Sequence, residues 1–276
     1  MSKHAFVVAI SEYSNSDNNL PGAKEDVPTI MPVLSSYGFN DIEVIQDKQA
    51  TRENIIQGLN NLFKDRQPGD VCVFYFSGHG VMFIQKNDSE NQDSNGQYEA
   101  LVPYEGTESS LILDNWLGEF FSNSIPDGVV FWGLYDSCYS GDLYKDVILQ
   151  KDEDEQDQIY EQDKTLKKKD IVKDLMPQFP QEKSSKQTKK LIVDDILKNA
   201  FHFGAADEDE RAICKPINGK SRSVFTWAIA EVLAGAPELT AQEFEGKVTN
   251  KVAEITKAHT PQLIASPWNK TQKIFS

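Results

Sequence analysis

A histidine and a cysteine each follow directly after a long apolar run in this sequence. The first run ends in Ser77-Gly-His-Gly80, which places His79 between two glycines. The second run, residues 128–135, is followed by small and polar residues that include Cys138. A cysteine thiolate is a strong nucleophile, and a neighbouring imidazole lowers the thiol pKa and protonates a leaving group. These two residue types therefore predict covalent catalysis by a cysteine, if the fold brings the side chains together.

Both apolar runs are predicted to be strands buried on both faces. They are short, rich in β-branched and aromatic residues, and bounded by turn residues, as in parallel sheets. Open parallel sheets carry their sites at the carboxyl ends of the strands, and the glycines beside His79 allow a tight bend there. The alternative for His79 is a buried, hydrogen-bonded structural histidine, since this residue type is of intermediate burial.

The two blocks Ser77-Gly-His-Gly80 and Asp136-Ser-Cys-Tyr-Ser-Gly141 resemble the catalytic blocks of the metacaspases and bacterial caspase-like peptidases. Other stretches agree with this resemblance: residues 20–26, 50–55 and 100–103, and Phe225-Thr226. The similarity is patchy between residues 85 and 98 and absent from about 145 to 190. The Gln-Ala-Cys-Arg-Gly block of animal caspases is missing, so the metacaspase side of the superfamily fits better.

The resemblance implies an α/β fold, the caspase-like sandwich, with a mainly parallel central sheet and helices on both faces. The order of elements in the first half agrees with it. We expect a strand over residues 5–10, a helix from Asp26 to Gly38, a strand over 42–46, a helix opened by Thr51 and then the histidine strand. Pro32 should kink or shorten the first helix, because an interior proline loses a hydrogen bond.

Three regions are expected along the chain. Residues 1–148 form a large, p20-like catalytic subdomain, with a mobile loop over 85–97 and a helix over 111–121. Half of the residues from 151 to 190 are charged, so 149–190 is predicted to be a disordered insert. Residues 191–276 form a small, p10-like subdomain that completes the same domain. Its predicted elements are a helical turn over 191–197, strands over 201–205 and 261–265, and helices over 223–233 and 240–258.

By resemblance, Cys138 is the nucleophile and His79 its acid–base partner. The backbone N–H groups of Gly80 and Cys138 would then bind the oxyanion of the intermediate. Asp26, Ser77 and Asp136 match positions of the metacaspase S1 pocket, where two carboxylates and a hydroxyl would hold an arginine or lysine side chain. The alternative is structural, with Asp26 capping its helix and Asp136 bracing a turn.

The predicted function is that of a cysteine endopeptidase that cleaves other proteins after arginine or lysine. A regulatory role, of the defence or cell-death kind, and synthesis as a zymogen are expected. A different class of function is a caspase-like binding or scaffold module whose activity is vestigial. A redox sensor built on Cys138 is a third idea, but the sequence offers no obvious resolving cysteine.

The composition of the chain limits which partners and which cellular compartment we expect. The 276 residues carry a net charge of −15, which argues against a nucleic-acid surface and would attract basic peptides. The longest apolar runs are too short to cross a membrane, and the three cysteines include no CxxC pair, so a reduced cytoplasmic location is expected. The expected partners are protein substrates with exposed arginine or lysine, and a regulatory partner is possible.

No cofactor is expected from the sequence, and the metal is left unknown. No glycine-rich nucleotide motif follows a strand. Asp114 resembles one of the aspartates that bind calcium in many metacaspases, but its neighbour is Asn115 and the 85–97 loop departs from the usual acidic pattern. One matched carboxylate is insufficient for a calcium site, since calcium takes several oxygen ligands.

Overall fold

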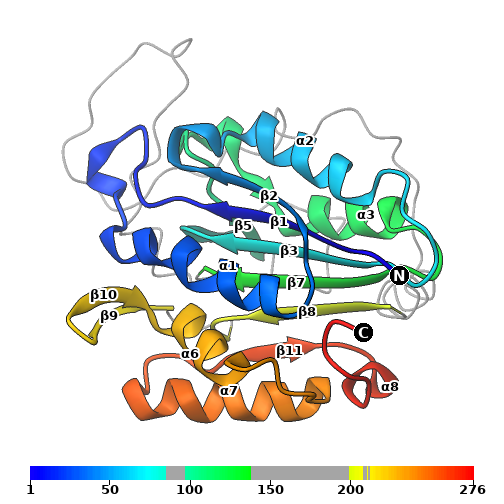
Figure 1. Ribbon diagram of the computed structural model, residues 1–276. Helices are drawn as coiled ribbons and strands as arrows, with labels where there is room; N and C mark the ends of the chain where they lie inside the picture. The colour runs from blue at the N-terminus through cyan, green and yellow to red at the C-terminus, as the bar shows by residue number, and fades with distance from the viewer. Residues whose placement is uncertain (85–96, 138–198, 208–209, 211) are drawn as a thin grey trace.

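The computed structural model describes residues 1–84, 97–137, 199–207, 210 and 212–276. A six-stranded sheet in the order β11-β8-β7-β3-β1-β2 forms its centre (Figure 1). Five of these strands are parallel, and β11 pairs antiparallel with β8 at one edge. The bounds of the six strands, in sheet order, are Gln262–Ile264, Ala200–Gly204, Val130–Asp136, Val71–Ser77, Lys3–Ala9 and Asp41–Gln46. The predicted mainly parallel sheet is confirmed.

Helices cover both faces of this sheet, as predicted (Figure 1). One face packs against α1 (Asp26–Ser36), α6 (Val224–Leu233) and α7 (Ala241–Ile255). The other face packs against α2 (Arg52–Phe63) and α3 (Asp114–Ser124). Every residue of β3 is buried, because this central strand has a helix layer on each side.

The helix α2 illustrates how local sequence signals and packing agree. Thr51 caps the helix, since its side chain accepts a hydrogen bond from the Asn54 backbone N–H at 3.2 Å. Its buried face includes Leu59 and turns toward the sheet. A Cβ atom at Gly58 would lie 2.2 Å from the Phe6 ring, so only glycine lets α2 approach β1 this closely.

The prediction for the first helix is correct at its ends, whereas the shortening predicted at Pro32 does not occur. The helix α1 begins at Asp26 and is followed by Gly38, whose φ of +85° suits a glycine after a helix. Pro32 does not shorten it, because the helix continues to Ser36. Pro32 cannot donate a backbone hydrogen bond. Burial of Ile30, and of the residues on the turn after the proline, in the core offsets this loss.

Several short elements were not predicted. A three-stranded antiparallel sheet consists of β4 (Gly80–Ile84), β5 (Gln97–Leu101) and β6 (Ile112–Leu113). A hairpin consists of β9 (Cys214–Ile217) and β10 (Lys220–Ser223), and a short helix, α8 (Pro267–Lys270), follows β11. The helix predicted over 111–121 therefore begins only at Asp114, because β6 pairs with β5 first. The helix predicted over 240–258 ends at Ile255.

Three predicted features lie outside the described residues. They are nearly all of the 85–97 loop, the 149–190 insert and the helical turn over 191–197. The later strands and helices of the small subdomain are present as β8, α6, α7 and β11. In the part of the chain that the structure describes, no helix has the length and hydropathy to cross a membrane.

Candidate active site

The carboxyl ends of β3 and β7 lie side by side and carry the two candidate catalytic blocks. Ser77 at the end of β3 is paired in register with Asp136 at the end of β7, and the Gly78 backbone N–H donates to the Asp136 carbonyl at 3.2 Å. Both blocks therefore begin at the same point of the sheet edge. Cys138 lies outside the described residues, which reach Ser137 on this strand, so its role stays a prediction.

His79 lies between β3 and β4 and is held on two sides. Its Nε2 is 2.8 Å from the backbone carbonyl oxygen of Asn18, and its own backbone N–H donates to the Tyr13 hydroxyl at 2.7 Å. The Tyr13 ring also packs against the imidazole, with centroids 5.0 Å apart. A carbonyl can only accept, so Nε2 carries a proton and Nδ1 is the nitrogen that can take one in the neutral ring. This arrangement suits a general base.

Gly80 begins β4 and pairs with Leu101 of β5. The adjacent carbonyl of His79 accepts a hydrogen bond from the Val102 backbone N–H at 3.0 Å, which ties the histidine turn to the small sheet. The turn is thus anchored on both sides of the imidazole. The oxyanion-binding role of the Gly80 N–H stays a prediction, because it is defined by its distance to a reacting carbonyl oxygen.

Asp26 is buried at the start of α1 and is surrounded by hydroxyl donors. Its Oδ2 accepts from Ser77 Oγ at 2.6 Å and from Ser223 Oγ at 2.6 Å. Burial raises the pKa of Asp26 well above its usual value, and the nearby Asp136 carboxylate raises it further, while the serine hydrogen bonds lower it. The structure therefore brings three predicted residues, Asp26, Ser77 and Asp136, into one cluster.

Asp136 is buried beside α6. Its Oδ2 accepts from the Thr226 backbone N–H at 2.9 Å and from the Thr226 hydroxyl at 2.5 Å. The Thr226 hydroxyl also lies 2.6 Å from the Tyr75 hydroxyl, which fixes its orientation. Burial raises the pKa of Asp136, and the bonds from Thr226 offset part of this effect. Among the described residues, no lysine or arginine forms an ion pair with either Asp26 or Asp136.

Sequence reasoning missed the residues that hold these carboxylates. Ser223 and Thr226 flank the amino end of α6, far along the chain from the carboxylates they contact. Phe225-Thr226 was part of the resemblance, but nothing in the local sequence shows which side chain Thr226 contacts. Asn18 contributes a backbone carbonyl, and that group gives no residue-type signal at all.

Gly22 and Cys214 form a close contact beside this cluster. A Cβ atom at Gly22 would lie 2.3 Å from the Cys214 sulfur, and that sulfur is 3.6 Å from Ser223 Oγ. Cys214 as a whole residue is exposed, but desolvation of its thiol group raises the thiol pKa to about 12, so the thiol is protonated at neutral pH.

The residues that the structure describes do not fit a calcium ion. Asp114 is the first residue of α3; burial raises the pKa of its carboxyl group, and hydrogen bonds from the backbone of Asn115 and Glu99 lower it. Within residues 1–84, 97–137 and the described part of 199–276, no three His, Cys, Asp or Glu side chains are grouped as metal ligands. Calcium takes six to eight oxygen ligands, so no step of the mechanism is derived through it.

The family assignment comes from a comparison of the whole chain with known families. The model of the peptidase C14 family, the caspase domain, matches residues 2–272. The chain belongs to this family.

Curated relatives and solved structures agree with this assignment. Metacaspase-1 of Debaryomyces hansenii is 31% identical over 148 residues, which cover 50% of this chain and 33% of that protein. Metacaspase-1 of Yarrowia lipolytica is 33% identical over 148 residues, with 50% and 31% covered. The matched stretch thus spans about a third of the length of these relatives.

Two solved structures share the fold. A crystal structure of a Geobacter sulfurreducens protein superposes with a TM-score of 0.65 at 15% identity and covers 100% of this chain and 99% of its own. Caspase-1 of Spodoptera frugiperda superposes with a TM-score of 0.55 at 11% identity, covering 95% and 86%. At these identities the structures support the caspase-like fold alone.

Proposed function

We propose that this caspase-family protein is a cysteine endopeptidase that cleaves other proteins after arginine or lysine. The observation that carries the specificity is the buried pair of carboxylates, Asp26 and Asp136, neither of which pairs with a lysine or arginine among the described residues. Burying one carboxylate beside another is costly unless a cation joins them. A substrate guanidinium or ammonium group would supply that cation through charge-assisted hydrogen bonds.

In the proposed reaction the Cys138 thiol gives its proton to Nδ1 of His79 and attacks the scissile carbonyl carbon. The backbone N–H groups of Gly80 and Cys138 stabilise the resulting oxyanion. When the C–N bond breaks, the imidazolium returns the proton to the leaving amine and a thioester remains. Water, deprotonated by His79, then hydrolyses the thioester and regenerates the thiol. The Asn18 carbonyl supports both steps, because it holds Nε2 and leaves Nδ1 to exchange the proton.

Regulated rather than digestive proteolysis is part of the proposal, with cytoplasmic protein substrates and activation from a zymogen. The charged 149–190 segment and the net charge of −15 support it, since neither suits indiscriminate digestion. Any calcium requirement would need ligands beyond those that the structure describes.

A panel of fluorogenic peptides that differ only at P1 tests this proposal, run beside alkylation of Cys138 by iodoacetamide. We expect turnover of arginine and lysine peptides, and loss of all turnover in Cys138→Ala. Cys138→Ala should keep the thermal midpoint of the wild type, because the change removes a single sulfur atom. Turnover by Cys138→Ala at the wild-type rate would refute the nucleophile. Preference for acidic or aromatic P1 residues would refute the pocket.

If the wild type alkylates at Cys138 but cleaves no peptide of the panel, the vestigial scaffold function is favoured instead. A His79→Ala variant separates the two functions further. In a peptidase it lowers turnover by several orders of magnitude, because the thiolate and the proton shuttle are lost together. In a scaffold protein, His79→Ala should leave the affinity for binding partners unchanged.

A further inference from the structure

A buried histidine lies near the Asp136 carboxylate and has no role in the reaction described above. His259 lies between α7 and β11 and is 3% exposed. Its Nδ1 is 2.6 Å from the backbone carbonyl oxygen of Ala205. The Ala205 N–H in turn donates to the Tyr135 carbonyl at 2.9 Å, so His259 is fixed at the carboxyl end of β8, next to the end of β7. The charge of His259 lowers the pKa of Asp136, which agrees with this placement.

The Nε2 atom of His259 is a buried acceptor that the described residues leave unsatisfied. The Ala205 carbonyl can only accept a hydrogen bond, so Nδ1 carries a proton and Nε2 of the neutral ring carries a lone pair. This Nε2 atom is buried, and no donor of the described residues reaches it. A buried polar atom without a partner costs free energy, and in a native structure it calls for a ligand or an ordered water.

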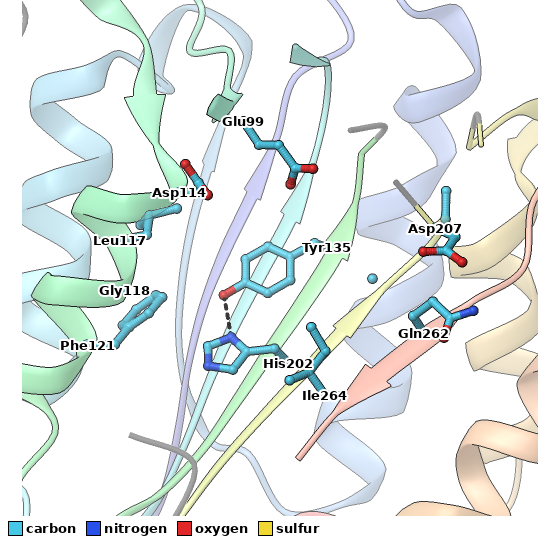
Figure 2. A pocket seen from close by; sticks show the side chains of 12 residues that line it. Glu99, Asp114, Leu117, Gly118, Phe121, Tyr135, His202, Asp207, Gln262 and Ile264 are labelled. Atoms are coloured by element: carbon cyan, nitrogen blue, oxygen red, sulfur yellow. Dashed lines mark hydrogen bonds between the residues drawn. The ribbon is translucent and has the colours of Figure 1, made fainter. Parts of the chain in front are cut away.

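His202, which also lies at this side of the sheet, has a different environment. Figure 2 shows its hydrogen bond with the Tyr135 hydroxyl, which lies 3.1 Å from Nδ1. Both rings line a cavity of about 340 Å³ on the face that α3 covers. Side chains alternate along a strand, so Asp136 points to the opposite face, where it contacts Thr226 of α6. Of these two histidines, His259 is therefore the one placed to reach a substrate beside Asp136.

We propose that Nε2 of His259 is a third acceptor of the substrate pocket, which binds a P1 arginine side chain together with Asp26 and Asp136 and favours arginine over lysine. This inference rests on the proposed peptidase function and names the basic residue that the pocket prefers. The histidine is a contact of the substrate side chain and takes no part in the transfer of protons at Cys138.

The preference for arginine follows from the number and direction of its donors. A guanidinium group has five N–H donors in a planar fork, so two can pair with a carboxylate while others remain for an acceptor elsewhere. An ammonium group is a compact charge with three donors, which two carboxylates can occupy. Lysine remains a substrate, because the carboxylates attract either cation, but it gains less from His259.

Two substitutions separate a substrate contact from a structural role of His259. Asparagine places its amide nitrogen near the position of Nδ1, so His259→Asn keeps a donor for the Ala205 carbonyl and removes the acceptor at Nε2. Glutamine reaches the position of Nε2, so His259→Gln keeps an acceptor there. A substrate contact requires His259→Gln to retain activity on arginine peptides and His259→Asn to lose it. A histidine that only anchors its loop on Ala205 requires the reverse order.

The measurement is kcat/KM at pH 8 for two peptides that differ only in arginine or lysine at P1. We expect His259→Asn to lower the value for the arginine peptide about tenfold or more and that for the lysine peptide less than about threefold. His259→Gln should stay within about threefold of wild type for both. The matched control is His4→Asn near the amino end of β1, where Nδ1 contacts Asp41, and it should change neither value. Thermal unfolding verifies that each variant folds.

Equilibrium binding keeps this inference separate from the proposed function. A fluorescein-labelled peptide with arginine at P1 is titrated with Cys138→Ala, alone or combined with His259→Asn, and its anisotropy is followed. Weaker binding by the double variant supports the contact even if the wild type cleaves no peptide.

Three results would overturn the contact. Cleavage of arginine peptides with an unchanged ratio of arginine to lysine activity in His259→Asn would do so and leave the peptidase function standing. Tighter arginine binding in His259→Asn would show that the protonated imidazole is the counter-ion of Asp136 instead. Neither binding nor cleavage of the arginine peptide would refute both the contact and the proposed function.

Discussion

At the scale of single residues, two buried carboxylates, Asp26 and Asp136, lie close together and have no lysine or arginine partner among the described residues. Asp26 is 1% exposed and Asp136 is 6% exposed, and each raises its energy by staying charged in that environment. Their partners are Ser77, Ser223 and Thr226, which orient the oxygens but bring no positive charge. His259 acts on Asp136 by its charge, and the proposed arginine or lysine side chain of a substrate would add a cation next to both carboxylates.

Removing one of these charges should damage substrate selection and spare the nucleophile. We expect Asp136→Asn to lower kcat/KM for arginine peptides by on the order of 10²- to 10³-fold, the usual cost of removing one partner of a buried charge pair. The rate of Cys138 alkylation by iodoacetamide should stay within a few-fold of wild type. Asp41→Asn at the exposed start of β2 is the matched control. An equal loss in both assays would instead mean that Asp136 supports the thiol.

The raised pKa of Asp26 predicts a pH dependence with a definite sign. The carboxylate is needed as an anion, so kcat/KM for arginine peptides should fall as the pH drops through the raised pKa of Asp26. The Asp136 charge contributes to that rise, so Asp136→Asn should move the acidic limb to lower pH. The rate of Cys138 alkylation, measured across the same pH range, is the control, because it depends on the thiol and His79 and not on the substrate side chain. A limb that moves identically in both profiles would contradict the assignment to Asp26.

The raised pKa of Asp26 also makes the stability of the fold depend on pH in a definite direction. The folded pKa of Asp26 is raised, so its contribution to stability is present at low pH and is lost as the pH rises through the folded value. At pH 7 the charged form therefore destabilises the fold. Asp26→Asn should raise the thermal midpoint at pH 7 and have little effect at pH 4, while it lowers turnover of arginine peptides. A lower midpoint at pH 7 would mean that the serine hydrogen bonds outweigh the burial cost.

At the scale of elements, close packing of helices on the sheet positions the ends of β3 and β7. The helix α2 contacts β1 through Gly58, while α6 brings its first turn onto Asp136. Each contact depends on one helix residue, Gly58 in α2 and Thr226 in α6. The site is therefore carried by helices and strands, with the candidate catalytic residue His79 on a short turn between two strands.

The contact of α2 with β1 should tolerate no side chain at residue 58. A Cβ atom would lie 2.2 Å from the Phe6 ring, which is itself buried, so we expect Gly58→Ala to lower the free energy of unfolding by about 1–3 kcal/mol. Gly246→Ala in α7 has open space and should gain up to about 1 kcal/mol from helix propensity. Urea unfolding of both variants measures the difference. A gain in both would show that the Phe6 ring moves at no cost.

At the scale of the whole molecule, one sheet spans the two predicted subdomains. β7 belongs to the large subdomain, and it pairs in parallel with β8 of the small one over five residue pairs. The core of the α1 face likewise contains Trp132 and Phe201, whose rings stack with centroids 4.1 Å apart. A cut in the chain between β7 and β8 would therefore leave two fragments with a large shared core.

We predict such a cut as the activation step. The segment between the subdomains lies outside the described residues, and its sequence offers Lys164 and the run from Lys167 to Lys169 but no arginine. We expect active protein to cleave itself after one of these lysines, while the two fragments stay together on size exclusion. Intact mass of wild type beside Cys138→Ala checks this. Full-length wild type under conditions where it cleaves peptides would exclude activation at this segment.

The sequence by itself determined the strands of the central sheet, most helices and the candidate catalytic blocks. Strands such as β3 are apolar along their whole length because they are buried on both faces, and this pattern is local. The resemblance of the blocks around His79 and Cys138 then predicted the family and the set of Asp26, Ser77 and Asp136. These features need no knowledge of distant contacts.

Only the tertiary structure decided what surrounds those residues. Ser223 at the end of β10 contacts Asp26, and Thr226 of α6 contacts Asp136, although both lie far along the chain from these carboxylates. The Asn18 carbonyl orients His79, and a backbone group gives no residue-type signal. A cavity of about 340 Å³ likewise arises where α3, β8 and β11 meet. Pairings of this kind depend on packing between segments remote in sequence, and a local pattern carries no information about them.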